Sequence, residues 1–131
     1  IGVTGVQTCA LPISVYRYAD VLLLLAEAKA KLGEDPSAEI NAIRLRGYGA
    51  GYTPHVNGGV TANMNAILGE YLREFIGEGK RWWALRRAGD SYVYANLNPT
   101  YFSPGSTAKF LLPLSLGMLQ ADPLLTQTPG Y

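Results

Sequence analysis

The chain has 131 residues, with 11 lysines and arginines against 10 acidic residues and a formal net charge of +1. Its 48% hydrophobic and 16% charged residues are typical of one globular domain or part of one and exclude a disordered tail. The small net charge predicts no nucleic-acid partner. The longest apolar run, residues 21–26, is far shorter than the roughly 20 residues that span a bilayer. A single Cys9 and a single His55 exclude an internal disulfide and leave too few ligands for a zinc site, so we expect no metal or cofactor.

We expect residues 1–14 to differ in origin from the rest of the chain. Residues 3–13 read VTGVQTCALPI, which matches the one-frame translation of a widely used DNA-sequencing adapter. A genuine short strand is the alternative. Added segments have to be excluded before fold reasoning, so Cys9 says nothing about redox compartment or lipidation. We predict a non-native segment over residues 1–14 and a protein segment over residues 15–131 whose upstream part is missing.

The first predicted helix covers residues 15–32. Its apolar positions are leucine, valine and alanine almost all round, which is typical of a helix buried on several sides. We expect part of its apolar flank to lie uncovered in this chain. The polar residues fall on one narrow stripe: Arg17, Asp20, Glu27 and Lys31.

The second predicted helix covers residues 36–46 and forms an antiparallel hairpin with the first. Gly33 is expected to end the first helix, because glycine tolerates the left-handed conformation of a helix C-terminus. Asp35 is expected to cap the second helix, with Pro36 in its first turn. The residues predicted to face inward are Ile40 and Ile43.

Residues 47–59 contain five glycines and Pro54 and are predicted to form a loop, with His55 in solvent. Thr61 is expected to cap a third, long helix over residues 61–87. Within it Gly77 and Gly79 weaken the helix, by about 1 kcal/mol each relative to alanine. A seven-residue repeat defines its buried face: Leu68, Phe75 and Trp82. Because Trp82 lies on that face, we predict that it is structural.

The C-terminal third has no helical period. Residues 90–107 are rich in Tyr, Asn, Ser and Pro and are predicted to form an ordered loop. Residues 110–112 are predicted to be extended, residues 115–120 to form one or two helical turns, and residues 122–131 to form an extended tail. The predicted fold is all-α, a tetratricopeptide-like hairpin plus a long helix with an irregular C-terminal wrap, and it is part of a larger domain.

Three groups of residues carry a family resemblance. The first is RYADVLLLLAEA at 17–28, followed by Asn41 and by RLR at 44–46. The second is Glu70, Arg73, Glu74, Glu78, Gly79, Arg81, Trp82, Leu85 and Arg87. The third is LLPL at 111–114, DP at 122–123 and QTPGY at 127–131. In this order and spacing they resemble the C-terminal region of the SusD/RagB family. The motif residues assigned a structural role are Arg17, Glu27, Arg44, Glu70, Glu74, Glu78, Gly79, Arg81 and Trp82. Tyr71 and Ala84 depart from the Arg and Asp usual in the family.

The resemblance implies a function that the residues alone do not. Members of this family are lipoproteins of the extracellular face of the outer membrane, anchored through an N-terminal cysteine that this chain lacks. They hold an oligosaccharide or other nutrient over a SusC-like TonB-dependent transporter and make or break no bond. Their ligand contacts come mostly from earlier segments. The resemblance thus implies non-catalytic capture and delivery of a nutrient.

Glu70, Glu74 and Glu78 lie one helical turn apart and allow two interpretations. Paired carboxylates are the acid and base of glycosidases. Like charges at this spacing destabilise a helix unless cations intervene, and Arg73, Arg81 and the hairpin arginines supply those cations. We therefore favour structural ion pairs and assign no catalytic residue.

Basic and aromatic residues are mixed in KRWWALRR at 80–87. This mixture suits nucleic-acid stacking or a membrane interface. The alternative is two tryptophans on the apolar face and cations near the helix C-terminus, and the net charge of +1 without a second basic patch favours it. The candidate ligand contacts are Tyr94 and Tyr101, because tyrosines among Asn and Ser suit sugar binding. The alternative is that these rings hold the loop to the core. As a whole, a tetratricopeptide-type protein-interaction scaffold is the alternative to nutrient capture, and a glycosidase is the third function considered.

Overall fold

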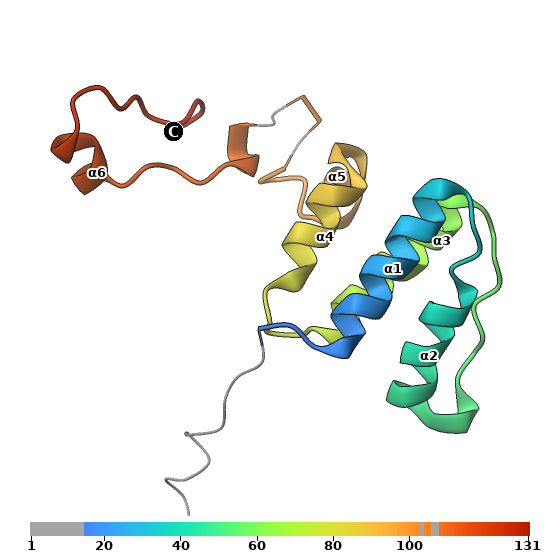
Figure 1. The fold of residues 1–131 in the computed structure, drawn as a ribbon. Coiled ribbons are helices and arrows are strands. Elements are labelled where there is room, and N and C mark those ends of the chain that lie inside the picture. Colours follow the sequence, from blue (N-terminus) through green and yellow to red (C-terminus); the bar gives the residue numbers. More distant parts are fainter. Residues whose placement is uncertain (1–14, 103, 106–107) are drawn as a thin grey trace, which may run out of the picture. The chain divides into compact units, whose positions relative to one another are not determined.

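The computed structural model describes residues 15–102, 104–105 and 108–131 (Figure 1). The prediction for residues 1–14 lies outside them. Helices are the regular elements, and the described residues contain no strand, so the all-α prediction is confirmed. In chain order the elements are α1 (Tyr18–Leu32), α2 (Ser37–Tyr48), η2 (Gly49–Gly51), α3 (Val60–Glu74), α4 (Lys80–Ala88), α5 (Asp90–Asn96), η3 (Ala108–Phe110) and α6 (Leu116–Ala121). No helix among these residues is both long and apolar enough to cross a membrane.

The chain divides into two compact units, Ile1–Glu78 and Gly79–Tyr131. In the first unit α1, α2 and α3 lie side by side, and α1 and α2 form the antiparallel hairpin (Figure 1). Alanines let the helices approach closely, while branched side chains fill the space between them. The fully buried side chains of this core include Leu23, Ala26, Ala30, Ile40, Ile67 and Leu68.

The turn between α1 and α2 forms as its sequence predicts. Gly33 has φ of 79°, and the amides of Gly33 and Glu34 donate to the carbonyls of Ala30 and Lys29 at 3.2 and 2.8 Å. These two bonds satisfy carbonyls that the end of a helix leaves unpaired. A carboxylate oxygen of Asp35 accepts the Ser37 amide at 2.8 Å. The second helix therefore starts at Ser37, one residue later than predicted, with Pro36 rather than Asp35 at its N-cap position and no side-chain cap bond there.

The polar stripe of α1 faces inward, which the sequence did not predict. Asp20 and Glu27 are only 3% and 5% exposed, whereas Val21 and Leu32 are 56% and 76% exposed. The buried carboxylate of Asp20 accepts the Arg17 amide at 2.8 Å, and that of Glu27 pairs with Lys31 at 3.1 Å. Exposed residues spaced three and four apart form what we call the outer seam: Tyr18, Val21, Leu25, Ala28 and Leu32.

The prediction of one long third helix is wrong. It begins at Val60, after Gly59, ends at Glu74, and is followed by a turn before α4 starts at Lys80. Gly77 and Gly79 have φ of 80° and 69°, the left-handed region that glycine enters without the Cβ clash. The glycines thus stop the helix rather than merely weaken it. The seven-residue repeat therefore does not run along one helix, because Leu68 and Phe75 lie in the first unit and Trp82 lies in the second.

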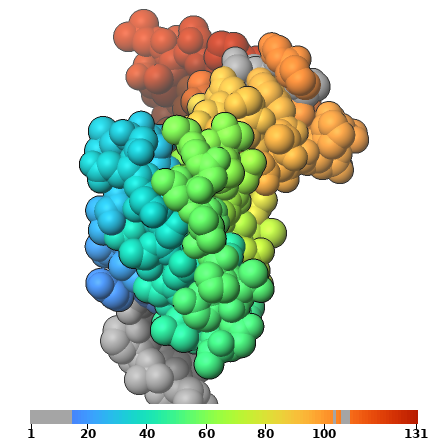
Figure 2. Space-filling model, turned by 90° about the vertical axis from the view of Figure 1, so that its right-hand side faces the viewer, coloured from blue at the N-terminus to red at the C-terminus, as the bar shows by residue number. Residues whose placement is uncertain are grey.

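The segment after α2 lies on the surface of the first unit. Figure 2 shows its green atoms beside those of α2. His55 is half-buried rather than free in solvent, because its amide donates to the side chain of Asn41 at 2.7 Å and its carbonyl accepts from the same side chain at 3.0 Å. Its ring Nε2 lies 3.0 Å from Oδ1 of Asn63, which is 1% exposed. Two asparagines therefore hold this loop.

In the second unit, residues 90–96 form α5 instead of the predicted loop, and Phe110 lies in η3 instead of an extended segment. Gly89 separates α4 from α5, and Arg86 pairs across this turn with Asp90 at 2.8 Å. The predicted turn of helix over 115–120 is confirmed as α6, whose first turn is capped by Ser115. The tail folds back on residues 111–114: Gln127 Oε1 accepts the Leu114 amide at 2.8 Å.

Candidate functional sites: an arginine–glutamate network and an aromatic cluster

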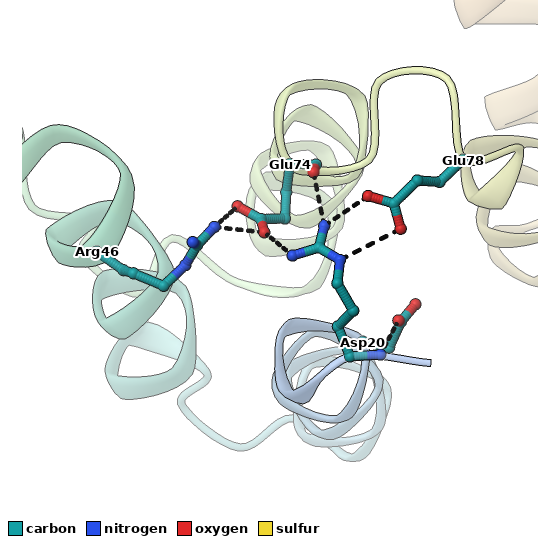
Figure 3. Close-up of polar contacts among 5 residues, drawn as sticks. Asp20, Arg46, Glu74 and Glu78 are labelled. Atoms are coloured by element: carbon teal, nitrogen blue, oxygen red, sulfur yellow. Dashed lines mark hydrogen bonds and ion pairs between the residues drawn. The ribbon is translucent and has the colours of Figure 1, made fainter. Parts of the chain in front are cut away.

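Arg17 ties the start of α1 to the end of α3. Its guanidinium donates to the Glu74 carboxylate at 2.7 Å and to the Glu74 backbone carbonyl at 2.9 Å (Figure 3). It also holds both oxygens of Glu78, at 2.8 and 3.2 Å. The same guanidinium lies 4.7 Å from the centre of the Phe75 ring. One side chain thus joins segments about sixty positions apart in sequence.

Glu74 also receives a cation from α2. Figure 3 shows Arg46 reaching both oxygens of its carboxylate. Burial acts to raise the pKa of Glu74, but the hydrogen bonds from Arg46 and Arg17 outweigh it, so the pKa lies below its ordinary value. The hydrogen bonds to Glu78 and then Glu74 raise the pKa of Arg17. A glycosidase general acid needs a raised carboxyl pKa, so Glu74 is unsuited to that role.

Glu70, one turn earlier on α3, is 2% exposed and is shared by two arginines. Arg44 of α2 reaches it at 2.7 Å and Arg73 at 2.6 Å. The three glutamates of the stripe are therefore all bound to arginines, which lie just before α1, in α2 and in α3. This arrangement fastens α1, α2 and α3 to one another.

Two further motif residues, Gly79 and Arg81, lie in the second unit together with Ala84, which departs from the family pattern. Gly79 precedes α4 in the left-handed conformation. Arg81 donates to the side chain of Asn96 in α5 at 3.0 Å, and burial lowers its pKa. Ala84, where the family usually has Asp, is 1% exposed, so an apolar side chain occupies a buried position of α4.

Trp82 is half-buried in an aromatic cluster of the second unit. Its ring centre lies 5.8 Å from that of Phe102 and 6.2 Å from that of Phe110. The Phe110 ring, 7% exposed, also contacts Tyr94 at 5.5 Å, and the guanidinium of Arg86 lies 4.3 Å from its centre. The cluster joins α4 and α5 to Phe102 and to Phe110 of η3.

The structure places the two candidate ligand residues differently. Tyr94 is half-buried against Phe110, and its hydroxyl is buried without a hydrogen-bond partner among the described residues. Tyr101 is 62% exposed. The structure does not bring the two together as one platform. Within the described part of the chain, no group of three His, Cys, Asp or Glu side chains is arranged to hold a metal ion.

Comparison with known proteins gives consistent results. A model of the SusD family matches residues 3–131. The chain is 40% identical over 87 residues to the SusD-like protein P38 of Formosa agariphila, a match that covers 57% of this chain and 16% of that protein. Its fold is similar to the structure of NanU from B. fragilis, with a TM-score of 0.71 and 43% identity over 89% of this chain and 26% of that one. The chain thus spans about a sixth to a quarter of the length of these relatives. With the family model matching nearly its whole length, this chain belongs to the SusD family.

Proposed function

We propose that this chain is the C-terminal part of a SusD-type protein that binds an oligosaccharide or other nutrient and delivers it to a SusC-like TonB-dependent transporter. The observation that carries this proposal is the family match over residues 3–131, together with the shared fold. Residues 15–131 are then a C-terminal segment, and the outer seam on α1 is the face that a preceding helix of the same protein covers.

The role of this segment is to build the scaffold, and the protein is not an enzyme. The glutamates that match glycosidase spacing are bound to arginines, and the pKa of Glu74 is lowered. General acid catalysis of glycoside hydrolysis needs the opposite shift. Among the candidate ligand residues, the exposure of Tyr101 supports a sugar contact better than the packed ring of Tyr94.

The proposed location is the extracellular face of the outer membrane, through a lipid anchor on an N-terminal cysteine. Residues 1–14 are proposed to be derived from a sequencing adapter. Sequencing the genomic locus tests this directly: a different sequence upstream of residue 15 supports it, and the same eleven codons contradict it.

The partner is tested by purifying the full-length, tagged protein from outer membranes in mild detergent and identifying what remains bound by mass spectrometry. The proposal predicts a TonB-dependent transporter in near-equal amount. An unrelated tagged outer-membrane lipoprotein is the control. Absence of a transporter from the sample, or equal recovery with the control, contradicts the proposed partner.

The outer seam also favours a second candidate function, a tetratricopeptide-type scaffold for a partner protein. Apolar residues at three- and four-residue spacing suit a helix of any origin. The two functions differ in the full-length protein. In nutrient capture its own helices cover the seam, so Leu25→Glu destabilises the protein. In a scaffold the seam stays exposed, so Leu25→Glu leaves stability unchanged and abolishes partner binding.

A further inference from the structure

An open cavity of about 300 Å³ lies on the first unit. Its volume is at the lower end of the range for small-molecule pockets. It lies between the end of α2, the turn that follows and the last part of α3. The residues that line it are Arg44, Tyr48, Gly51, Tyr52, Thr53 and Arg73.

The wall of this cavity carries more positive than negative charge. Arg44 and Arg73 share one carboxylate, that of Glu70, at 2.7 and 2.6 Å. Glu70 is buried, whereas the side chain of Arg73 is 49% exposed and that of Arg44 is 18% exposed. Two guanidinium groups with one shared anion leave one positive charge without a counter-charge where both side chains line the cavity.

Each arginine also keeps a free donor. Arg44 uses Nε on Glu70 and Nη1 on the carbonyl of Thr53, and Arg73 uses Nε and Nη2 on Glu70. Nη2 of Arg44 and Nη1 of Arg73 have no hydrogen-bond partner in the described part of the chain. Guanidinium donors match the geometry of a carboxylate.

The two guanidinium groups are held in place. The bond to the Thr53 carbonyl, at 2.9 Å, fixes Arg44 against the cavity wall. Gly69 gives room to Arg73, because a Cβ at Gly69 would lie 3.2 Å from Nη2 of Arg73. Positioned donors lose less conformational entropy on binding than free side chains do.

Two tyrosines complete the lining. Tyr48, 54% exposed, and Tyr52 present aromatic rings beside the cations. An aromatic ring packs against the C–H face of a sugar, while a guanidinium pair takes a carboxylate. We propose that this cavity binds an acidic monosaccharide of the uronic acid class, with its carboxylate on Arg44 and Arg73. The choice of a sugar rather than another carboxylate rests on the proposed nutrient-binding function.

The test uses the full-length protein and calorimetric titration with sodium glucuronate, with glucose as the neutral match and phosphate as the plain anion. Arg73→Gln removes one donor and one charge at the cavity. Arg46→Gln removes the same charge from an arginine that does not line it. We expect glucuronate to bind and glucose and phosphate to bind at least about tenfold more weakly, with Arg73→Gln losing about tenfold or more in glucuronate affinity and Arg46→Gln unchanged.

A second measurement needs no variant. Phenylglyoxal modifies exposed arginines, and peptide mass spectrometry reads each site separately. Glucuronate should slow the modification of Arg73 and leave that of Arg46 unchanged, and glucose should protect neither. The proposal is overturned if glucuronate fails to bind or protect, if phosphate or glucose is its equal, or if Arg73→Gln binds as the wild type does. Capture of a neutral glycan by a protein that ignores glucuronate would overturn this site and leave the proposed function standing.

Discussion

Glu74→Gln is expected to lower the free energy of unfolding by about 2 kcal/mol. The side chain of Glu74 is 7% exposed and accepts hydrogen bonds from Arg17 and Arg46, whose side chains are 31% and 61% exposed. A hydrogen bond to a charged group contributes about 1.5–3 kcal/mol when shielded from water, and an ion pair with an exposed partner about 0–1 kcal/mol. The bond to Arg17 therefore accounts for most of the loss.

Glu78→Gln is the matched control, because its side chain is 34% exposed and Arg17 keeps Glu74 as a partner. We expect a loss of about 1 kcal/mol or less for this variant. Both values come from urea denaturation of the full-length protein at pH 7. Equal losses in the two variants, or no loss in Glu74→Gln, would show that Arg17 does not join α1 to α3 as described.

The effect of Glu74 depends on pH with a definite sign. Its folded-state pKa lies below the ordinary value of 4.5, so the carboxylate stabilises the folded state above that value. This contribution is lost as pH falls through the folded-state pKa. The stability difference between wild type and Glu74→Gln should therefore be full at pH 7 and shrink below about pH 4.5. A difference that grows on acidification would contradict the assigned ion pairs.

Five further variants test other parts of the structure by the same denaturation assay. Asn63→Ala should cost about 2 kcal/mol, because its buried amide holds the loop after α2, and amide exchange in that loop should rise. Gly79→Ala should cost about 1–2 kcal/mol because its φ is positive, whereas Gly117→Ala, inside α6, should be neutral or stabilising. Trp82→Ala should cost about 3 kcal/mol, the low end for large core aromatics, and leave glycan affinity unchanged. Tyr101→Ala should cost less than about 1 kcal/mol and weaken glycan binding.

The parts of the fold that the sequence predicted are those with local causes. The hairpin follows from Gly33 and Asp35, which act within one turn of their own positions. The short helix α6 follows from Ser115 in the same way. Local capping groups need no knowledge of the rest of the chain, so pattern reasoning suffices.

The parts that it missed depend on distant partners. The direction that α1 faces is set by Arg17, whose carboxylate partners lie 57 and 61 positions away. The break after α3 depends on Gly77 and Gly79 both adopting left-handed φ, a choice that hydrophobic periodicity does not reveal. Asn41 likewise holds the loop from 14 positions away, and Asn63 does so from five to eight positions away. The signal in the sequence for this hold on the loop is a pair of asparagines that flank a glycine-rich segment.

The most direct test of the central claim is calorimetric titration of the full-length protein with a panel of neutral and acidic oligosaccharides, with the mass of each ligand measured after recovery. The claim predicts saturable binding of at least one panel member, which is recovered with its mass unchanged. Shortening of a bound oligosaccharide, or no binding across the panel by a protein that unfolds cooperatively, would contradict non-catalytic capture of a glycan nutrient.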